Sequence, residues 1–293
     1  MSAAALEQPI PAIAPPTVVI QATRGWASLR LGDLWEYREL LYFMVWRDVK
    51  VRYKQTALGI AWIVLQPVLS MVVFSLLFGG LLKVPSNGVP YPIFLYSALL
   101  PWNYFAGSLT RASTSLVSSS NLISKVYFPR LTIPLSGVLS GLVDFAVSFC
   151  VLIALMALYR IAPTPRVLLL PAFLALAMLT ALGFGLWLSA LNVQYRDVNY
   201  LVPFLVQIWM YLTPVIYGAT LLPEQFRWLL ALNPMSLVTE GFRWALLGPA
   251  APASQISQSS PALLVMPLVV VVVVSVTGLV FFKRTERTFA DII

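Results

Sequence analysis

Long apolar stretches without a single charged residue constrain this sequence more than any other feature. Residues 55–82, 84–110, 167–195 and 198–223 contain no Asp, Glu, Lys or Arg. Each stretch is longer than the roughly 20 apolar residues that cross a bilayer as a helix. The composition agrees, because 59% of the residues are hydrophobic and 10% are charged, against roughly 45–50% and about 25% in soluble domains. We therefore expect an all-α membrane protein with several spans.

The residue types that are rare or missing exclude several classes of enzyme. One cysteine, Cys150, and no histidine exclude an internal disulfide, a Cys/His zinc site, a histidine general base and a Cys–His nucleophile pair. The sequence contains no Gly-Lys pair, so it lacks the GxxxxGK[ST] loop that cradles nucleotide phosphates. We expect a chain that does not hydrolyse nucleotide by itself and binds no cofactor or metal.

The charged residues divide the chain into six expected transmembrane helices and one odd segment. The spans are expected at about residues 57–82, 91–110, 131–159, 167–191, 200–217 and 261–282. Residues 223–247 form two short apolar pieces that are split at Asn233 and Pro234, and each piece is too short to span. This pattern favours a re-entrant or interfacial helical hairpin, which protein must cover because lipid cannot satisfy its backbone.

Residues 1–30 are expected to precede the transmembrane domain, which we place at residues 31–293 and which begins with an interface helix. The first residues are rich in Pro and Ala, and residues 1–30 are expected to be a disordered tail. Residues 33–50 are expected to form an amphipathic helix in the membrane interface, with Asp33 as its N-cap and Glu36 completing a capping box. An ordinary surface helix of a cytoplasmic extension is the alternative.

The distribution of basic residues predicts the orientation of the six spans. With both termini in the cytoplasm, 14 of the 19 Lys and Arg residues lie on the cytoplasmic side. The other five are Lys83, Arg160, Arg166, Arg227 and Arg243. This bias follows the positive-inside rule. The excess of 8 basic over acidic residues therefore reports topology, and nucleic acid is not expected as a partner.

Two features of the third span bear on its packing. Asp144 is the one acid inside a predicted span, where an ionisable group is a functional hypothesis by default. No basic residue of a predicted span answers it, so a structural hydrogen bond to Ser or Thr on a neighbouring helix is favoured over a pore-lining role. Gly137 and Gly141 form a GxxxG motif suited to close helix contact, within the chain or between chains.

Aromatic residues gather in or near spans one, two and five. A membrane-interface belt explains Tyr91 and Tyr217 well, because both lie at span ends. Several others lie inside the apolar lengths, where their ring faces could line a pore along which sugar rings slide. The candidates for such a substrate channel are Trp62, Tyr96, Trp102, Tyr104, Trp209 and Tyr211.

Two predicted cytoplasmic segments are candidates for contact with a partner subunit or with a lipid headgroup. Residues 118–130 are expected to hold a short helix with Leu122, Ile123, Val126 and Tyr127 exposed, to which a soluble subunit would dock. The second segment is the basic run at residues 46–56, at the start of the first span. Its cations either set topology alone or also bind a phosphorylated headgroup.

Four separated motifs, in this order, resemble one protein family. They are WRDVKVRYKQTALGIAWIVLQP (46–67), LISKVYFPR (122–130), NVQYRDVNYLVPFLVQIWMYLTPVIY (192–217) and LNPMS (232–236). Together they look like the polysaccharide-export permeases of the type 2 ABC transporters, which carry O-antigen, capsule or teichoic-acid chains. The resemblance covers about residues 31–293, and the Pro-rich tail has no clear counterpart.

The resemblance implies a homodimeric six-span permease of the bacterial inner membrane. It implies two ATP-binding-cassette subunits as partners, which bind ATP and Mg²⁺ and drive an undecaprenyl-diphosphate-linked glycan through an aromatic-lined channel. Carried over by position, ATPase coupling falls on Ser120, Leu122, Lys125, Tyr127, Phe128 and Arg130. Binding of the lipid diphosphate falls on Arg47, Arg52 and Lys54. The periplasmic gate falls on Arg227, Asn233, Pro234 and Glu240.

Other classes remain open at this stage. An integral membrane transferase acting on polyprenol-linked sugars would need clustered Asp and Glu at a membrane face, and the acids here are scattered. A secondary transporter would show related halves with broken helices and midplane charges. A permease for another lipid-like substrate would share the motifs above.

Overall fold

Every regular element that the structure describes is a helix. The computed structural model describes residues 31–54, 59, 61–86, 88–248 and 261–289, and the predicted tail at residues 1–30 lies outside them. The first half contains α1 (Leu31–Glu36), α2 (Arg38–Lys54), α3 (Ala61–Phe74), the π-helix η2 (Ser75–Leu81), α4 (Tyr91–Ser118), α5 (Ser120–Ile123) and α6 (Thr132–Leu158). The second half contains η3 (Pro165–Leu169), α7 (Leu170–Gln194), α8 (Val198–Leu212), η4 (Ala219–Leu221), η5 (Glu224–Phe226), α9 (Arg227–Leu232), α10 (Pro234–Leu247), α12 (Pro261–Thr285) and η7 (Glu286–Thr288).

Four helical stretches in the described residues are long and apolar enough to cross a membrane. They are Ala61–Leu81, Thr132–Leu158, Pro165–Gln194 and Leu264–Thr285. These stretches correspond to the predicted spans one, three, four and six, which confirms an all-helical membrane protein. The fifth predicted span is the apolar helix α8, which has 15 residues and would be about 22 Å long.

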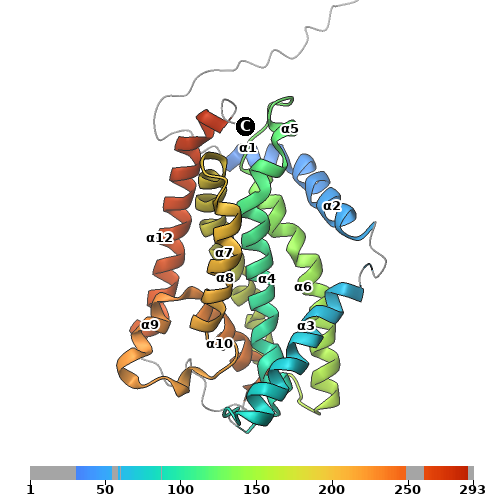
Figure 1. The fold of residues 1–293 in the computed structure, drawn as a ribbon, viewed down its shortest axis with the longest axis vertical. Helices are drawn as coiled ribbons and strands as arrows, with labels where there is room; N and C mark the ends of the chain where they lie inside the picture. Colours follow the sequence, from blue (N-terminus) through green and yellow to red (C-terminus); the bar gives the residue numbers. More distant parts are fainter. Residues whose placement is uncertain (1–30, 55–58, 60, 87, 249–260, 290–293) are drawn as a thin grey trace, which may run out of the picture.

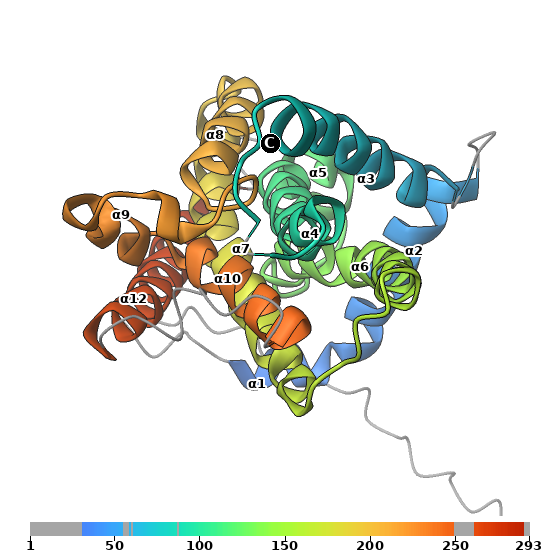
Figure 2. The same cartoon turned by 90° about the horizontal axis from the view of Figure 1, so that it is seen from below.

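The second predicted span is the central helix of the molecule. Figure 2 shows α4 surrounded by α3, α6, α7 and α10. This helix has 28 residues, about 42 Å at 1.5 Å per residue, so it is long enough to cross a bilayer. Its neighbours shield it from lipid, which explains why it carries more polar residues than the outer helices.

Helix α4 extends beyond the predicted end of this span at about residue 110, because it continues for two more turns to Ser118. The prediction stopped at the first charged residue, Arg111. In the structure this side chain is folded between α4 and α6, where Ser108 and the carbonyl of Gly137 accept its hydrogen bonds. A charge with such partners does not end a buried helix.

Glycines set the closest contacts of α4. A Cβ atom at Gly137 would lie 3.3 Å from the backbone nitrogen of Ala112, and one at Gly185 would lie 2.7 Å from the Ala112 side chain. The GxxxG motif of α6 therefore mediates a helix contact within the chain. This resolves the alternative that the sequence left open for Gly137 and Gly141.

The N-terminal helix differs from its prediction in extent and pattern. It is broken at Tyr37 into α1 and α2, and Asp33 lies inside α1 rather than capping it. The apolar residues of α2 do not form one stripe, because Met44 is buried while Tyr42 and Phe43 are exposed. In Figure 1, α2 slopes along α6 and ends beside the middle of that helix.

Residues 223–247 form two short helical pieces, as predicted, with the break at Asn233. The Asn233 side chain caps α10 by accepting a hydrogen bond of 3.1 Å from the Met235 backbone nitrogen. Pro234 occupies the first turn, where a missing N–H costs nothing. Helix α10 packs against α4 and α7 and is largely buried.

Candidate functional site

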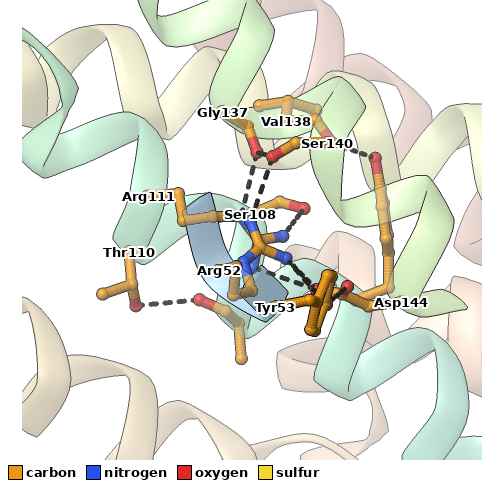
Figure 3. Close-up of polar contacts among 11 residues, drawn as sticks. Arg52, Tyr53, Ser108, Thr110, Arg111, Gly137, Val138, Ser140 and Asp144 are labelled. Atoms are coloured by element: carbon orange, nitrogen blue, oxygen red, sulfur yellow. Dashed lines mark hydrogen bonds and ion pairs between the residues drawn. The ribbon is translucent and has the colours of Figure 1, made fainter. Parts of the chain in front are cut away.

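Ionisable side chains from α2 and α4 converge on Asp144 of α6. Arg52 and Tyr53 come from the end of α2, Arg111 comes from α4, and Asp144 lies in the middle of α6 (Figure 3). Both Arg52 and Tyr53 donate hydrogen bonds to the Asp144 carboxylate. The Nη1 atom of Arg111 lies 3.6 Å from an Asp144 carboxylate oxygen. The expectation that no basic residue answers Asp144 is therefore wrong.

Arg111 was not identified as a site residue from the sequence. Its position directly after a long apolar stretch marked it as a boundary charge. Its Nε donates to the Gly137 carbonyl at 3.0 Å, and its Nη2 donates to Ser108 Oγ at 3.1 Å. The available signal was Asp144 itself, because a carboxylate inside a membrane protein needs a cation close by.

Small residues leave room for this arginine. A Cβ atom at Gly141 would collide with the Arg111 guanidinium and would lie 2.7 Å from Ser108 Oγ. Ser140 accepts a 3.3 Å hydrogen bond from Arg52 Nη2. The small-residue stripe of α6 therefore has a second role, since it admits the two cations as well as packing the helices.

A cavity of about 720 Å³ opens beside this cluster, which is within the range of small-molecule sites. It lies among the end of α2, α3, α4 and α6. The charged and aromatic residues that line it are Arg52, Tyr53, Trp62, Tyr104, Arg111, Asp144 and Phe145. Its amide and hydroxyl groups come from Gln66, Asn103 and Ser148. Cations, amides and aromatic faces in one cavity suit an anionic ligand with a sugar attached.

Two of the six predicted channel aromatics line this cavity. Trp62 is 52% exposed, and Tyr104 is buried with its hydroxyl donating to the Val138 carbonyl at 3.2 Å. Tyr96 and Trp102 are buried in the interior of a single chain, so this conformation offers them no surface toward a channel.

The two aromatics of α8 differ from each other. Trp209 packs edge-on between Phe105 and Phe184, each with a centroid distance of 4.9 Å, and its Nε1 donates to Asn233 Oδ1 at 2.9 Å. This side chain joins α8 to the break between α9 and α10. Tyr211 is half exposed and is free of such packing contacts among the described residues.

The three predicted headgroup cations do not act from one place. Arg52 lines the cavity. Arg47 instead forms an ion pair of 2.9 Å with its neighbour Asp48, and Lys54 is exposed at the end of α2. The structure therefore brings together Arg52 and Arg111 rather than Arg52 with its predicted partners.

The predicted ATPase-coupling segment contains the expected short helix, the single turn α5. Tyr127 is 75% exposed, whereas its neighbour Phe128 is 5% exposed and packs with Met44 and Phe289. Ile123 is also buried, contrary to its prediction.

The other predicted coupling residues also differ in their exposure to solvent. Lys125 is exposed, and Ser120 and Leu122 are partly buried. Arg130 donates to the backbone carbonyl of Glu286 at 2.6 Å, which ties the segment to the end of α12.

The predicted gate residues include one fully buried ion pair. Glu240 and Arg243 lie 2.8 Å apart on α10, and both side chains are almost completely buried. Arg243 also donates to the carbonyls of Pro214, Val215 and Tyr217. Arg227 forms only a surface ion pair of 3.4 Å with Glu224, which adds little stability.

The fold and the site together define a helical membrane-protein domain with a cationic, aromatic cavity between its helices. The family model described as ABC-2 type transporter matches residues 39–247, from the start of α2 to the end of α10. The chain belongs to the ABC-2 type transporter family, which confirms the resemblance.

Curated relatives agree with this assignment. The O-antigen export system permease protein RfbA of Myxococcus xanthus is 36% identical over 210 residues, which cover 71% of this chain and 80% of the relative. A protein of the same name from Klebsiella pneumoniae is 28% identical over 256 residues, which cover 87% and 95%. The polysialic acid transport protein KpsM of Escherichia coli is 20% identical over 202 residues, which cover 69% and 78%.

Proposed function

We propose that this chain is the transmembrane permease subunit of an ATP-driven exporter that carries an undecaprenyl-diphosphate-linked polysaccharide across the bacterial inner membrane. The observation that carries the proposal is the 36% identity, over 71% of the chain, with a relative named as an O-antigen export permease. The cavity supports it, because guanidinium groups recognise phosphate and aromatic faces stack on sugar rings. The glycan is an O-antigen, a capsule chain or a similar polymer.

The proposed topology has six spans, with α4 and α8 added to the four long apolar stretches. Figure 1 supports cytoplasmic termini, because α1, α5 and the C-terminal end of α12 lie at the same end of the molecule. In this topology α9 and α10 form a re-entrant hairpin at the periplasmic end, covered by α4, α7 and α12. Arg227, Asn233, Pro234 and Glu240 belong to this gate.

The energy comes from two separate ATP-binding-cassette subunits that hold ATP and Mg²⁺. They dock on residues 120–130, where Tyr127 and Val126 are exposed apolar side chains at the cytoplasmic end. Of the predicted coupling residues, the exposed Tyr127 and Lys125 make contact, while Phe128 and Arg130 hold the segment in place.

A second copy of the chain completes the channel. Helices α3 and α8 lie on the same side of α4 (Figure 2) and present exposed apolar residues, among them Leu69, Val73, Phe204 and Tyr211. A surface of this kind is covered by lipid or by another copy. We place the glycan path between the two copies, with Trp62 and Tyr211 as the lining aromatics that this conformation exposes.

The transferase alternative has no support in the described residues. They contain no group of three or more His, Cys, Asp or Glu side chains close enough to hold a metal ion. A permease for a different lipid-like substrate remains the second hypothesis, because the cavity would also accept another phosphorylated lipid.

The test is export in cells that lack this chain. We expect its loss to abolish the surface polysaccharide while lipid-linked glycan accumulates in the cytoplasm, and we expect the wild-type chain with its ATPase partner to restore export. A partner with an inactive nucleotide site is the control and should restore nothing. Normal surface glycan in the deletion strain would overturn the polysaccharide assignment. ATP hydrolysis by the purified chain alone would contradict its role as a permease subunit.

A further inference from the structure

The geometry points to an anion exchange inside the cavity: Arg52 and Arg111 form the site for the diphosphate of the lipid-linked substrate, and Asp144 occupies that site until the diphosphate displaces it. This inference rests on the proposed function and specifies its substrate site. It adds Arg111 as a binding residue and gives Asp144 the role of a built-in competitor. The cluster is shown in Figure 3.

The cluster carries more positive than negative charge. Two guanidinium groups face one carboxylate, and among the described residues no other Lys, Arg, Asp or Glu lines the cavity. Residues 55–58 and 60, beside the cluster in sequence, carry no charge. The site thus has an excess of one positive charge in a region where lone charges are costly. A purely structural pair would be neutral, whereas a site that awaits an anion keeps a surplus cation.

Most of the contacts that hold Arg111 are with uncharged groups. Its Nε and Nη2 donate to Gly137 and Ser108, which fixes the plane of the guanidinium. Its Nη1 lies 3.6 Å from Asp144, well beyond the roughly 2.7–2.9 Å of a charge-assisted hydrogen bond. Arg111 is therefore held in position mainly by neutral partners and keeps a donor directed toward the Asp144 side of the cavity.

Asp144 lies where a bound anion would contact both arginines. Its carboxylate accepts hydrogen bonds from Arg52 and Tyr53 and faces Arg111. Phosphate oxygens accept hydrogen bonds from the same donors as carboxylate oxygens do, and a diphosphate carries more negative charge than a carboxylate. A diphosphate at this place would satisfy both arginines, and Asp144 would keep the Tyr53 hydroxyl as its partner.

The cavity has room for the rest of the headgroup. Asn103 lies eight residues before Arg111 on α4, about 12 Å along the helix, and both residues line the cavity. Gln66 and the exposed Trp62 line it from α3. A phosphate at Arg111 therefore leaves amide and aromatic groups for the first sugars.

The test is equilibrium binding to the full chain with its ATPase partner in lipid nanodiscs. The probes are farnesyl diphosphate, farnesol and inorganic pyrophosphate. We expect farnesyl diphosphate to bind at least about tenfold more tightly than farnesol, since a charge-assisted hydrogen bond contributes an effect of this size. Competition by pyrophosphate at similar concentrations would show that the phosphate alone is recognised. Competition only by the prenylated form would assign the site to the lipid headgroup. Equal binding of the diphosphate and the alcohol would overturn the inference.

Substitutions of the arginines and of Asp144 should change the affinity for farnesyl diphosphate in opposite directions. Arg111→Gln and Arg52→Gln should each weaken diphosphate binding about tenfold or more and leave farnesol binding unchanged. Asp144→Asn should tighten diphosphate binding, because the competing anion is gone. Arg196→Gln, at an exposed position between α7 and α8, is the matched control. If Asp144→Asn weakens binding as the arginine variants do, Asp144 is structural and the exchange is wrong.

A second variant keeps the test decisive if Asp144→Asn does not fold. Arg111→Lys preserves the charge but loses the planar donor fork, so we expect an affinity between wild type and Arg111→Gln. Wild-type affinity in both Arg111 variants would overturn the site. A separate export measurement distinguishes failure of the diphosphate site from failure of the proposed function. If binding follows the expected pattern but no polysaccharide is exported, the site stands and the proposed function fails. Normal export together with unaltered binding in Arg111→Gln would refute the site alone.

Discussion

Two ion-pair clusters in the described residues each join arginine to a carboxylate, and they have opposite characters. Glu240 and Arg243 are almost completely buried, balance each other in charge, and are surrounded by backbone carbonyls that accept from Arg243. The Asp144 cluster is partly exposed, has one cation in excess and faces a cavity. A charge pair that is closed and neutral holds a structure together, while one that is open and unbalanced can exchange partners.

The closed cluster fixes the irregular segment after α8. Arg243 donates to the carbonyls of Pro214, Val215 and Tyr217, and Tyr91 donates to the carbonyl of Ile216 at 2.6 Å. The Arg243 guanidinium also lies 3.9 Å above the Phe94 ring. One arginine thus joins α10, the start of α4 and the end of α8, which gives the predicted gate a rigid frame.

Among the substitutions that test the difference between the two clusters, Arg243→Leu is expected to have the largest effect on stability. The substitution removes one partner of a fully buried ion pair and the donor to three backbone carbonyls, so we expect a loss of about 3–5 kcal/mol in the free energy of unfolding. Thermal unfolding in detergent and abundance in the membrane measure this. Arg111→Gln is the comparison, and we expect it to lose export while most of the protein stays folded. Equal destabilisation by both substitutions would remove the distinction between the clusters.

The next effect concerns neighbouring residues of the coupling segment. Phe128→Asp puts a charge into a buried apolar cluster and should destabilise the chain by several kcal/mol. Tyr127→Asp changes an exposed side chain and should leave folding intact while it weakens binding of the ATPase subunit.

Co-purification of the ATPase, read together with the unfolding temperature of the permease, separates the two effects. A Tyr127→Asp chain that still binds and stimulates its partner normally would place the docking surface elsewhere.

Two of the three tryptophans that were predicted to line a channel, Trp62 and Trp209, should respond differently to substitution by leucine. Trp209→Leu removes two edge-to-face contacts of about 0.5–1.5 kcal/mol each and one hydrogen bond of about 1 kcal/mol. We therefore expect about 2–4 kcal/mol of destabilisation.

Trp62→Leu removes an exposed ring that lines the cavity. It should leave stability nearly unchanged and instead shorten or reduce the surface glycan. Glycan length at matched membrane abundance measures the effect, and a wild-type pattern for Trp62→Leu speaks against sugar stacking in this cavity.

The smallest effect on export is expected for substitution of Arg47. Its comparison with Arg52 tests whether the Asp144 cluster binds the headgroup. Arg47→Gln breaks only an exposed pair with Asp48, which contributes about 0–1 kcal/mol, so export should stay within about twofold of wild type. Arg52→Lys keeps the charge but loses the guanidinium fork and should lower export more. A larger loss from Arg47→Gln than from Arg52→Lys would return headgroup binding to the surface run at residues 46–56.

Much of the fold could be predicted because the membrane imposes local requirements. Uncharged apolar length sets the positions of α3, α6, α7 and α12, since each must satisfy its own backbone in lipid. The break at Asn233 and Pro234 was also local, because a capping side chain followed by proline specifies a helix start. The family was predictable for a similar reason, as its motifs are short runs of adjacent residues.

The tertiary structure alone decided which side chains meet. Arg52, Arg111 and Asp144 are far apart in sequence, and their meeting depends on the slope of α2 along α6 and on the room that Gly141 leaves for Arg111. Burial likewise separated Trp62 from Trp209 and Tyr127 from Phe128, which are alike in sequence terms. Hydropathy describes what a helix contacts on average, whereas the partner of a charge or an aromatic ring depends on how neighbouring helices are packed.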